Sequence, residues 1–481
     1  MTTTALETVA HWIGGERLQE ASRYGEVTDP ATGAVTRRVA FASAADVDRA
    51  VGAARAGFEA WSVQSLTKRT NVLFKFREIL AANAGEIARV ITAEHGKTVD
   101  DARGEVQRGL EVVEFACGVA HLMKGEASEA VATGVDSHSL RQPLGVAVGI
   151  TPFNFPAMVP MWMFPLALAC GNAFILKPSE KDPSASLLMA EWLAEAGLPG
   201  GAFNVLHGDV EAVQALLRHP GVDSVSFVGS TPVAKSIYET ATTHGKRVQA
   251  LGGAKNHAVV MPDADVDIAA DAIASAAYGS AGQRCMAISA VVAIGPAGDA
   301  LAEALAARVD AVQVGPGAEE GSQMGPVVSG AARDRVLSAI EAGVGEGAEL
   351  RRDGRGVSVS GHEDGFWVGP TLFDRVTSEM SVYRDEIFGP VLVLLRAETF
   401  EEALDLVNRN PYGNGASIFT TDGRTAREFE HGAQVGMIGV NVPIPVPMAY
   451  YSFGGWKQSL FGDLHVHGRE GVLFYTRGKV V

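Results

Sequence analysis

Cysteine is scarce in this sequence. The chain has 481 residues and three cysteines, Cys117, Cys170 and Cys285. Three thiols so far apart cannot all pair within one chain, which argues against a disulfide scaffold and favours a reducing compartment. The amino-terminal segment also lacks a basic stretch followed by an apolar run, so no secretory signal is expected. These two features together predict a cytoplasmic location.

Basic residues are too few for a nucleic-acid partner. The 40 Lys and Arg residues face 56 Asp and Glu residues, giving a net charge of −16. Binding to phosphate backbones needs a basic face, so nucleic acid is not expected as the main partner. The sequence also has no P-loop, and its His, Cys and Asp residues lack metal-ligand spacing, so no metal is expected. The segment 343–348 loosely matches a dinucleotide pattern, but it follows a helix and is interpreted as a turn.

One uncharged stretch could be mistaken for a membrane span. Residues 142–176 carry no charged side chain. Prolines at positions 152, 156, 160 and 165 interrupt the middle of the stretch. Prolines at this density break a helix repeatedly, so a buried strand, a loop and a helix are expected, with no membrane partner.

Low-complexity linkers and internal repeats are absent, and helical and strand-like segments alternate instead. Helical spacing of apolar residues predicts helices at 44–62, 66–93, 98–123, 183–197, 210–218, 231–244, 265–282, 299–309 and 400–409. Short apolar runs predict strands at 145–151, 173–179, 203–208, 224–230, 257–262, 287–295 and 391–396. This alternation predicts two α/β domains built on parallel sheets, with a boundary near residue 255. The strand-like carboxyl terminus favours an oligomer.

Cys285 differs from the other two cysteines in its surroundings. Cys117 and Cys170 lie in apolar helical segments and are expected to be inert core residues. Cys285 follows Gly282-Gln283-Arg284, and a neighbouring arginine favours the thiolate form of a cysteine. Cys285 is therefore a candidate nucleophile.

Three other segments follow predicted strands and carry polar groups. Asn154 could donate a hydrogen bond to an oxyanion, or could simply satisfy a turn. Lys177 and Glu180 could bind ribose hydroxyls, with Glu180 favouring NAD over NADP, or could form a solvated turn. Gly229 and the helix that follows could bind a pyrophosphate, although Ser230 or Thr231 could equally be a plain helix cap.

Seven blocks in order along the chain resemble the aldehyde dehydrogenase superfamily. They are TPFNFP (151–156), LKPSE (176–180), FVGST (227–231), LGGAKNH (251–257), GQRC (282–285), EIFGP (386–390) and PYGN (411–414). The resemblance implies an NAD-dependent enzyme with Cys285 as nucleophile and Asn154 as oxyanion donor. It also implies cofactor contacts from Thr151, Phe153, Lys177, Glu180, Lys181, Gly229, Ser230, Gly252, Glu386 and Phe388.

The block around Leu251 departs from the hydrolytic members of that family. They carry a glutamate that activates water for deacylation, and aligning Lys255 with the lysine of their block puts Leu251 at that position. Leucine cannot act as a base, and loss of a general base costs about 10²–10⁴-fold in rate. A thiol needs less activation than water, so coenzyme A is expected as the acyl acceptor.

This pattern is similar to the methylmalonate-semialdehyde dehydrogenase branch of the family. That branch oxidises malonate or methylmalonate semialdehyde, giving acetyl-CoA or propionyl-CoA with loss of CO₂. The resemblance implies that Arg108 and Arg284 bind the substrate carboxylate, since a guanidinium suits that group. Alternatively, Arg108 could be an exposed residue paired with Glu105 or Glu111, and Arg284 could only tune Cys285.

The resemblance also implies a domain arrangement. Residues 1–123 and 144–255 would form an NAD-binding domain, residues 256–452 a catalytic domain, and residues 124–143 and 453–481 a small β oligomerisation element. The assembly would be a dimer or a tetramer. Two other functions remain open: a hydrolytic semialdehyde dehydrogenase with a relocated base, and a catalytically silent scaffold of the same fold.

Overall fold

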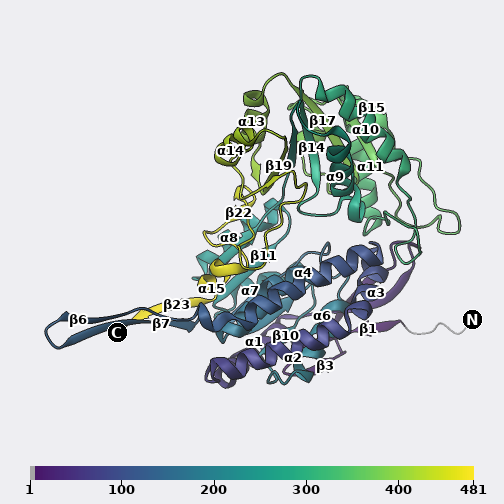
Figure 1. Ribbon diagram of the computed structural model, residues 1–481. Helices are drawn as coiled ribbons and strands as arrows, with labels where there is room; N and C mark the ends of the chain where they lie inside the picture. Colours follow the sequence, from purple (N-terminus) through teal and green to yellow (C-terminus); the bar gives the residue numbers. More distant parts are fainter. Residues whose placement is uncertain (1–5) are drawn as a thin grey trace, which may run out of the picture.

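A computed structural model describes residues 6–481 as two α/β lobes with a β-sheet arm projecting from one side (Figure 1). Residues 1–5 lie outside the described residues. They belong to the predicted first domain and to the amino-terminal segment in which no secretory signal is expected. In the described part of the chain, no helix is long and apolar enough to cross a bilayer. The uncharged stretch forms a strand, a loop and a helix, as the sequence predicted.

The sheet of the first lobe has eight strands. In spatial order they are β22 (Leu460–Phe461), β12 (Arg247–Leu251), β11 (Ser224–Val228), β8 (Val146–Ile150), β9 (Ala173–Lys177), β10 (Phe203–Val205), β2 (His11–Ile13) and β3 (Glu16–Leu18). The five central strands are parallel. Four of them were expected, whereas the sequence pattern did not indicate β12 or the antiparallel edge strands β22, β2 and β3. A separate three-stranded sheet contains β1 (Glu7–Val9), β5 (Val35–Phe41) and β4 (Arg23–Thr28).

Both faces of the eight-stranded sheet are covered, because every residue of its five central strands except Arg247 is buried. Val146, Val148 and Ile150 of β8 join one apolar cluster with the helices α1 (Ala44–Ser62), α7 (Val210–Arg218) and α8 (Thr231–Thr243). Ala147, between them, joins a second cluster on the opposite face. The helices of that face are α2 (Leu66–Ala82), α3 (Ala84–His95), α4 (Val99–Cys117), α5 (Met158–Cys170) and α6 (Ser184–Glu195).

The second lobe contains a seven-stranded sheet that is parallel except for one edge. In spatial order its strands are β15 (Glu349–Arg352), β16 (Thr371–Asp374), β17 (Val391–Ala397), β14 (Ile288–Ile294), β13 (Asn256–Val260), β19 (Gly415–Phe419) and β20 (Met437–Val440). The helices of this lobe are α9 (Val266–Tyr278), α10 (Ala297–Ala311), α11 (Gly330–Gly345), α12 (Ser381–Arg384), α13 (Phe400–Arg409) and α14 (Gly423–Gly432). The short strands β18 (Tyr412–Gly413) and β21 (Trp456–Lys457) pair beside it.

Three predicted helices end earlier than expected. The segment 66–93 divides at Asn83, whose side-chain amide donates to the Ile79 carbonyl at 2.8 Å and competes with the helix backbone. Helix α4 stops at Cys117, before Gly118 and the 3₁₀ turn η1 (Val119–His121). Helix α9 stops at Tyr278, before the 3₁₀ turn η2 (Gly279–Gly282). The glycine-rich segment 343–348 forms the end of α11 and the turn into β15.

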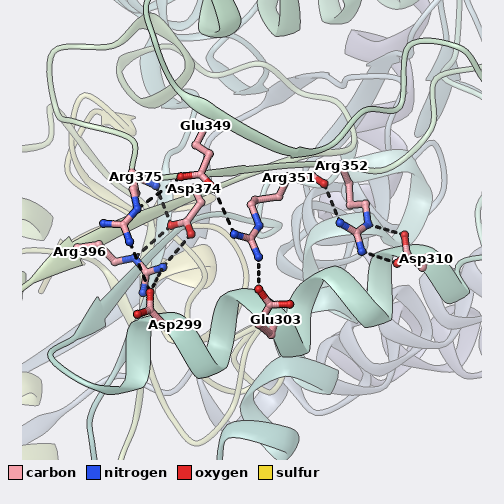
Figure 2. A network of polar contacts seen from close by, with 9 residues as sticks. All are labelled: Asp299, Glu303, Asp310, Glu349, Arg351, Arg352, Asp374, Arg375 and Arg396. Atoms are coloured by element: carbon pink, nitrogen blue, oxygen red, sulfur yellow. Dashed lines mark hydrogen bonds and ion pairs between the residues drawn. The ribbon is translucent and has the colours of Figure 1, made fainter.

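An ion-pair network fastens α10 to the edge of the second sheet (Figure 2). Arg396 pairs with Asp374 of β16 at 2.8 Å and with Asp299 of α10 at 3.1 Å. The other members are Glu303, Asp310, Glu349, Arg351, Arg352 and Arg375. Each exposed pair contributes little by itself, so the apolar contacts beneath them hold the helix in place.

The projecting arm is a three-stranded sheet of β6 (Ala127–Ala132), β7 (Val135–Pro143) and β23 (Thr476–Val480) (Figure 1). Its carboxyl-terminal strand follows α15 (Gly468–Phe474) and is anchored by Arg247. That guanidinium donates to the carbonyl groups of Leu473 at 3.0 Å, Phe474 at 2.7 Å and Thr476 at 2.7 Å. Asn172 adds a bond to the Tyr475 carbonyl at 3.0 Å. Residues far apart in sequence therefore fix where the arm begins.

Replacing Arg247 by methionine should loosen the arm at its root. Three carbonyl groups would lose a charged donor, at a cost of about 2–3 kcal/mol. We expect faster amide hydrogen exchange in β23 and β7 and a lower melting temperature. Arg218→Met is the matched control, since Arg218 is exposed and bonds only within its own helix. Unchanged exchange in β23 would contradict the anchoring role.

Candidate active site

A cleft lined by residues of both lobes lies beyond the strand ends of the first sheet. In the first sheet, the chain passes from β8 to β9 and β10, then returns to place β11 on the other side of β8. Ligands of such sheets bind beyond the carboxyl ends of the strands at this reversal point. The segments that follow β8, β9 and β11 line a cleft of about 850 Å³. The opposite wall comes from segments that precede β14 and β17 in the second sheet.

Twelve residues singled out from the sequence line this one cleft. They are Thr151, Phe153, Asn154, Lys177, Glu180, Lys181, Gly229, Ser230, Gly252, Cys285, Glu386 and Phe388. Arg108 and Arg284 do not line it. The cleft thus brings together a thiol, a buried amide, two lysines and two carboxylates drawn from both lobes.

Cys285 follows an unusual backbone turn. Ser280, Ala281 and Gly282 all have left-handed φ angles, of 53°, 50° and 68°. A side chain at Gly282 would also collide with the Gly389 carbonyl, because an added Cβ would lie 2.1 Å from that oxygen. Asp101 of α4 stabilises the turn, accepting from the Ser280 amide at 3.0 Å and from Arg284 Nη2 at 2.5 Å. Strained backbone held in this way is typical of functional sites.

The main chain of Cys285 is fixed by two asparagines that the sequence did not single out. Its carbonyl accepts from Asn256 Nδ2 at 2.9 Å and from Asn414 Nδ2 at 3.1 Å. Both residues lie inside blocks quoted for the family resemblance, but nothing in the local pattern distinguished them from other strand-end polar residues. Their contacts join the starts of three separate strands of the second sheet at Cys285.

The expectation that Arg284 favours a Cys285 thiolate is outweighed in the structure. Burial and, to a smaller extent, the nearby Glu386 carboxylate raise the pKa of the Cys285 thiol to about 12. Arg284 lowers this pKa, but it is the smallest of the contributions, and its charge is shared with Asp101. Burial also raises the pKa of Cys117 to about 11 and of Cys170 to about 12, which fits inert core thiols.

The loop that carries Asn154 rests on two residues that the sequence did not single out as functional. Asn154 is buried at the edge of the cleft, and its carbonyl accepts from Lys97 Nζ at 2.5 Å. Lys97 in turn pairs with Glu105 at 2.8 Å, with both side chains fully buried. Lys97 and Asn154 are 57 positions apart, so no local sequence signal could have linked them.

Lys177 and Glu180 do not form a solvated turn. Lys177 is buried, and its Nζ lies 3.5 Å from Glu180 Oε2. Burial lowers the pKa of Lys177, whereas the two lysines at positions 177 and 181 help to lower that of Glu180 despite its own burial. These charges sit at one end of the cleft and can bind hydroxyl groups.

The start of α8 is open to the cleft. Ser230 is the capping residue, but its side chain makes no capping bond. The hydroxyl of Thr231 accepts from the Gly253 amide at 2.8 Å and so holds the next strand end against the helix. The helix amides near Gly229 are consequently available to an anion.

Glu386 lies against the opposite wall. Its Oε1 accepts from the Ala254 amide at 2.9 Å, and an added Cβ at Gly253 would lie 2.3 Å from its Oε2. Burial raises the pKa of Glu386 to about 7. It therefore titrates near neutral pH, close enough to Cys285 to affect that thiol.

Each of the two arginines proposed for the substrate has a carboxylate partner. Arg284 bonds to Asp101, and Arg108 bonds to Glu111 at 2.9 Å, the pairing considered as its structural alternative. Arg108 and Asp101 are seven residues apart on α4, so they lie on nearly the same face, about 10 Å apart along the axis.

Leu251 ends β12 as a buried apolar residue. Its neighbours Ala250, Gly252 and Gly253 also lack a carboxylate, so a shift of the alignment by one or two positions would not supply the missing base. Among the described residues that line the cleft, the carboxylates are Glu180, Asp209 and Glu386.

Comparisons with known proteins agree along nearly the whole chain. A model described as the aldehyde dehydrogenase family matches residues 18–481. A malonate-semialdehyde dehydrogenase of Pseudomonas aeruginosa is 54% identical, over 98% of this chain and 96% of the relative. A Geobacillus thermodenitrificans malonate-semialdehyde dehydrogenase is 49% identical, over 100% of this chain and 99% of the relative.

Solved structures agree as closely. The methylmalonate-semialdehyde dehydrogenase of Oceanimonas doudoroffii superposes with a TM-score of 0.98 at 52% identity, covering 99% of this chain and 98% of that one. A Sinorhizobium meliloti protein complexed with NAD, named as a candidate methylmalonate-semialdehyde dehydrogenase, also gives 0.98, at 50% identity over 100% of this chain and 98% of that one.

Glu386→Gln should stabilise the protein more at high pH than at low pH. Burial raises the pKa of Glu386 from 4.5 to about 7, so the native carboxylate costs stability as the pH rises between these values. The cost is constant above that window and is at most about 3 kcal/mol. Urea unfolding at pH 5 and pH 8 measures it, with the exposed Glu401→Gln as control. An equal change in the free energy of unfolding at both pH values would show that the pKa of Glu386 is not raised.

Proposed function

Because the chain belongs to the aldehyde dehydrogenase family, we propose that it is an NAD-dependent malonate- or methylmalonate-semialdehyde dehydrogenase that transfers its acyl group to coenzyme A. Aldehyde, NAD and coenzyme A give acetyl-CoA or propionyl-CoA, CO₂ and NADH. The observation that carries the coenzyme A step is the apolar end of β12, where Leu251 and its neighbours supply no base. The relatives named for malonate and methylmalonate semialdehyde support the substrate class.

The cleft residues fit a bound dinucleotide. Lys177 and Glu180 would bind hydroxyl groups of the adenosine ribose, and the open start of α8 would bind the pyrophosphate. The hydroxyl of Thr151 is buried in the cleft wall without a hydrogen-bond partner among the described residues, as expected of a group that meets a ligand. Glu386 would bind the second ribose, and Phe388 would pack near the nicotinamide. NAD supplies the hydride acceptor when it is bound.

Acylation uses groups from both lobes. The Cys285 sulfur attacks the aldehyde carbon and the carbonyl oxygen becomes an oxyanion, which the Asn154 amide and the Cys285 backbone N–H stabilise. With a pKa of about 12 the Cys285 thiol is protonated at neutral pH, so it must lose its proton before the sulfur can attack. Oxidation would then leave a thioester on Cys285 that still carries the substrate carboxylate. Loss of that carboxylate as CO₂, with a proton taking its place on the α carbon, is needed to give the acetyl or propionyl group.

Deacylation distinguishes the two candidate functions. The thiolate of coenzyme A attacks the thioester carbon, the bond to Cys285 breaks, and Cys285 regains its thiol. A hydrolytic enzyme is the second candidate, favoured by one observation: Glu386 has a pKa of about 7 and lies near Cys285, as a base for water would. Its bond to the Ala254 amide and its place as a ribose ligand argue against that role.

The substrate carboxylate would meet the face of α4 that carries Arg108. Arg284 is nearer to the nucleophile, because it is the preceding residue, and Asp101 fixes its direction. We propose Arg284 as the principal carboxylate ligand, with Arg108 further along the face of α4 that carries Asp101.

The projecting arm would join copies of the chain into a dimer or tetramer. The two lobes would then be the NAD-binding and catalytic domains.

Turnover of malonate semialdehyde should depend on coenzyme A. With NAD and coenzyme A the protein should form NADH steadily and release acetyl-CoA. Without coenzyme A, NADH formation should stop after about one equivalent per site, or proceed about 10²–10⁴-fold more slowly. NADH absorbance and chromatography of the acyl product measure both quantities. Equal turnover without coenzyme A, yielding a free acid, would establish the hydrolytic alternative instead.

Arg284→Met should impair carboxylate-bearing aldehydes selectively. Loss of a charged hydrogen bond costs about 1.5–3 kcal/mol, or roughly a 10–100-fold drop in kcat/KM for malonate semialdehyde. Propanal, which has no carboxylate, should lose much less. Arg284→Lys keeps the charge and should recover part of the difference. An equal loss for both aldehydes would mean that Arg284 acts on Cys285 rather than on the substrate.

A further inference from the structure

A fully buried ion pair lies beneath the Asn154 loop, outside the cleft. Lys97 Nζ and Glu105 Oε2 are 2.8 Å apart, and neither side chain has any exposed surface. Lys97 precedes α4, and Glu105 lies in its second turn. Neither residue lines the cleft or takes part in the chemistry described above. Their placement nevertheless determines the backbone of a residue that does.

Both partners of the pair bind one short stretch of backbone. Lys97 Nζ donates to the Asn154 carbonyl at 2.5 Å, and it lies 4.4 Å from the centre of the Phe155 ring. Glu105 Oε1 accepts from the amides of Ala157 at 2.8 Å and Met158 at 3.1 Å. Residues 154–158 are thus held at three backbone atoms by two side chains that also hold each other.

Glu105 also caps the amino terminus of α5, which has no capping side chain of its own. The helix begins at Met158, and Ala157 has no side chain that could cap it. A carboxylate at this end satisfies free amides and interacts favourably with the helix dipole. The start of α5 is therefore fixed relative to α4, and with it the distance from α4 to Asn154.

The cost of burying two charges points to a geometric purpose. Apolar residues of similar size are often at least as stabilising as a buried ion pair. The Asn154 amide group makes no hydrogen bond to any described residue, so its direction depends on how the Asn154 backbone is held. Lys97 binds that backbone at the carbonyl of Asn154 itself, which limits rotation of the peptide that follows.

We propose that Lys97 and Glu105 are positioning residues that aim the Asn154 amide at the oxyanion formed on the substrate carbonyl. The inference rests on the proposed role of Asn154 and goes beyond it, because it names what gives that amide its direction. Cys285 is held separately, by Asp101, Asn256 and Asn414. The two halves of the site can consequently be disturbed one at a time.

The test compares Lys97→Met, Glu105→Gln and the double variant in the full-length protein. Each single variant removes one member of the buried pair and should lower the melting temperature. The double variant removes both charges of the pair, and the carboxamide oxygen introduced by Glu105→Gln can still accept from the two amides. Its stability should therefore return close to that of the parent. Its acylation rate should remain at least about tenfold reduced, because the Asn154 carbonyl still lacks its donor.

Three measurements separate positioning from mere stability. The first NADH formed with malonate semialdehyde reports acylation, the melting temperature reports folding, and iodoacetamide labelling reports Cys285. Alkylation of Cys285 does not require Asn154, so its rate should stay within about threefold of the rate in the parent protein. Asp100→Asn is the matched control, because Asp100 is an exposed carboxylate next to the same helix turn and should change none of the three.

Each outcome decides between the roles. A slow double variant with normal stability and normal labelling supports the proposal. Recovery of acylation together with stability in the double variant overturns it and makes the pair purely structural. Asn154→Ala serves as reference: if it acylates as fast as the parent, the proposed role of Asn154 fails, whereas a slow Asn154→Ala beside a fast double variant defeats only the positioning role.

Discussion

The site depends on one constraint: two sheets meet end to end, and strand ends leave polar backbone groups without ladder partners. The carboxyl ends of β8, β9 and β11 face the segments that lead into β14 and β17. Each loop at this seam must satisfy its own amides and carbonyls or direct them at a ligand. The bonds of Asp101 to Ser280, of Glu386 to Ala254 and of Thr231 to Gly253 are three solutions to that requirement.

Sequence patterns found the cleft because its residues follow or precede buried strands. The apolar runs placed β8, β9 and β11, so the positions of Asn154, Lys177 and Gly229 at one sheet edge followed from topology alone. The proposal that Cys285 is the nucleophile needed the family resemblance as well, since a cysteine beside Gly and Arg is only a candidate. The antiparallel edge strands were missed because two- and three-residue strands carry no periodicity.

The supporting residues could not be predicted for a different physical reason. Lys97 precedes a helical segment that has the pattern of an amphipathic surface helix, and Glu105 lies within that segment, yet both side chains are fully buried. Their partners are 57 and 52 positions away, so burial and pairing are visible only in three dimensions. The thiol of Cys285 illustrates the same limit: the adjacent Arg284 was evident from sequence, whereas the burial that outweighs it was not.

The order in which the chain is synthesised is at odds with the order in which its first lobe can be completed. Strand β12 ends at Leu251, but its neighbour β22 begins at Leu460, and the carbonyl groups that Arg247 binds come later still. At a translation rate of about 5–20 residues per second, roughly 10–40 seconds separate these partners. During that interval the edge of β12 is an unpaired strand on a nascent protein, and the whole second lobe must emerge before it is covered.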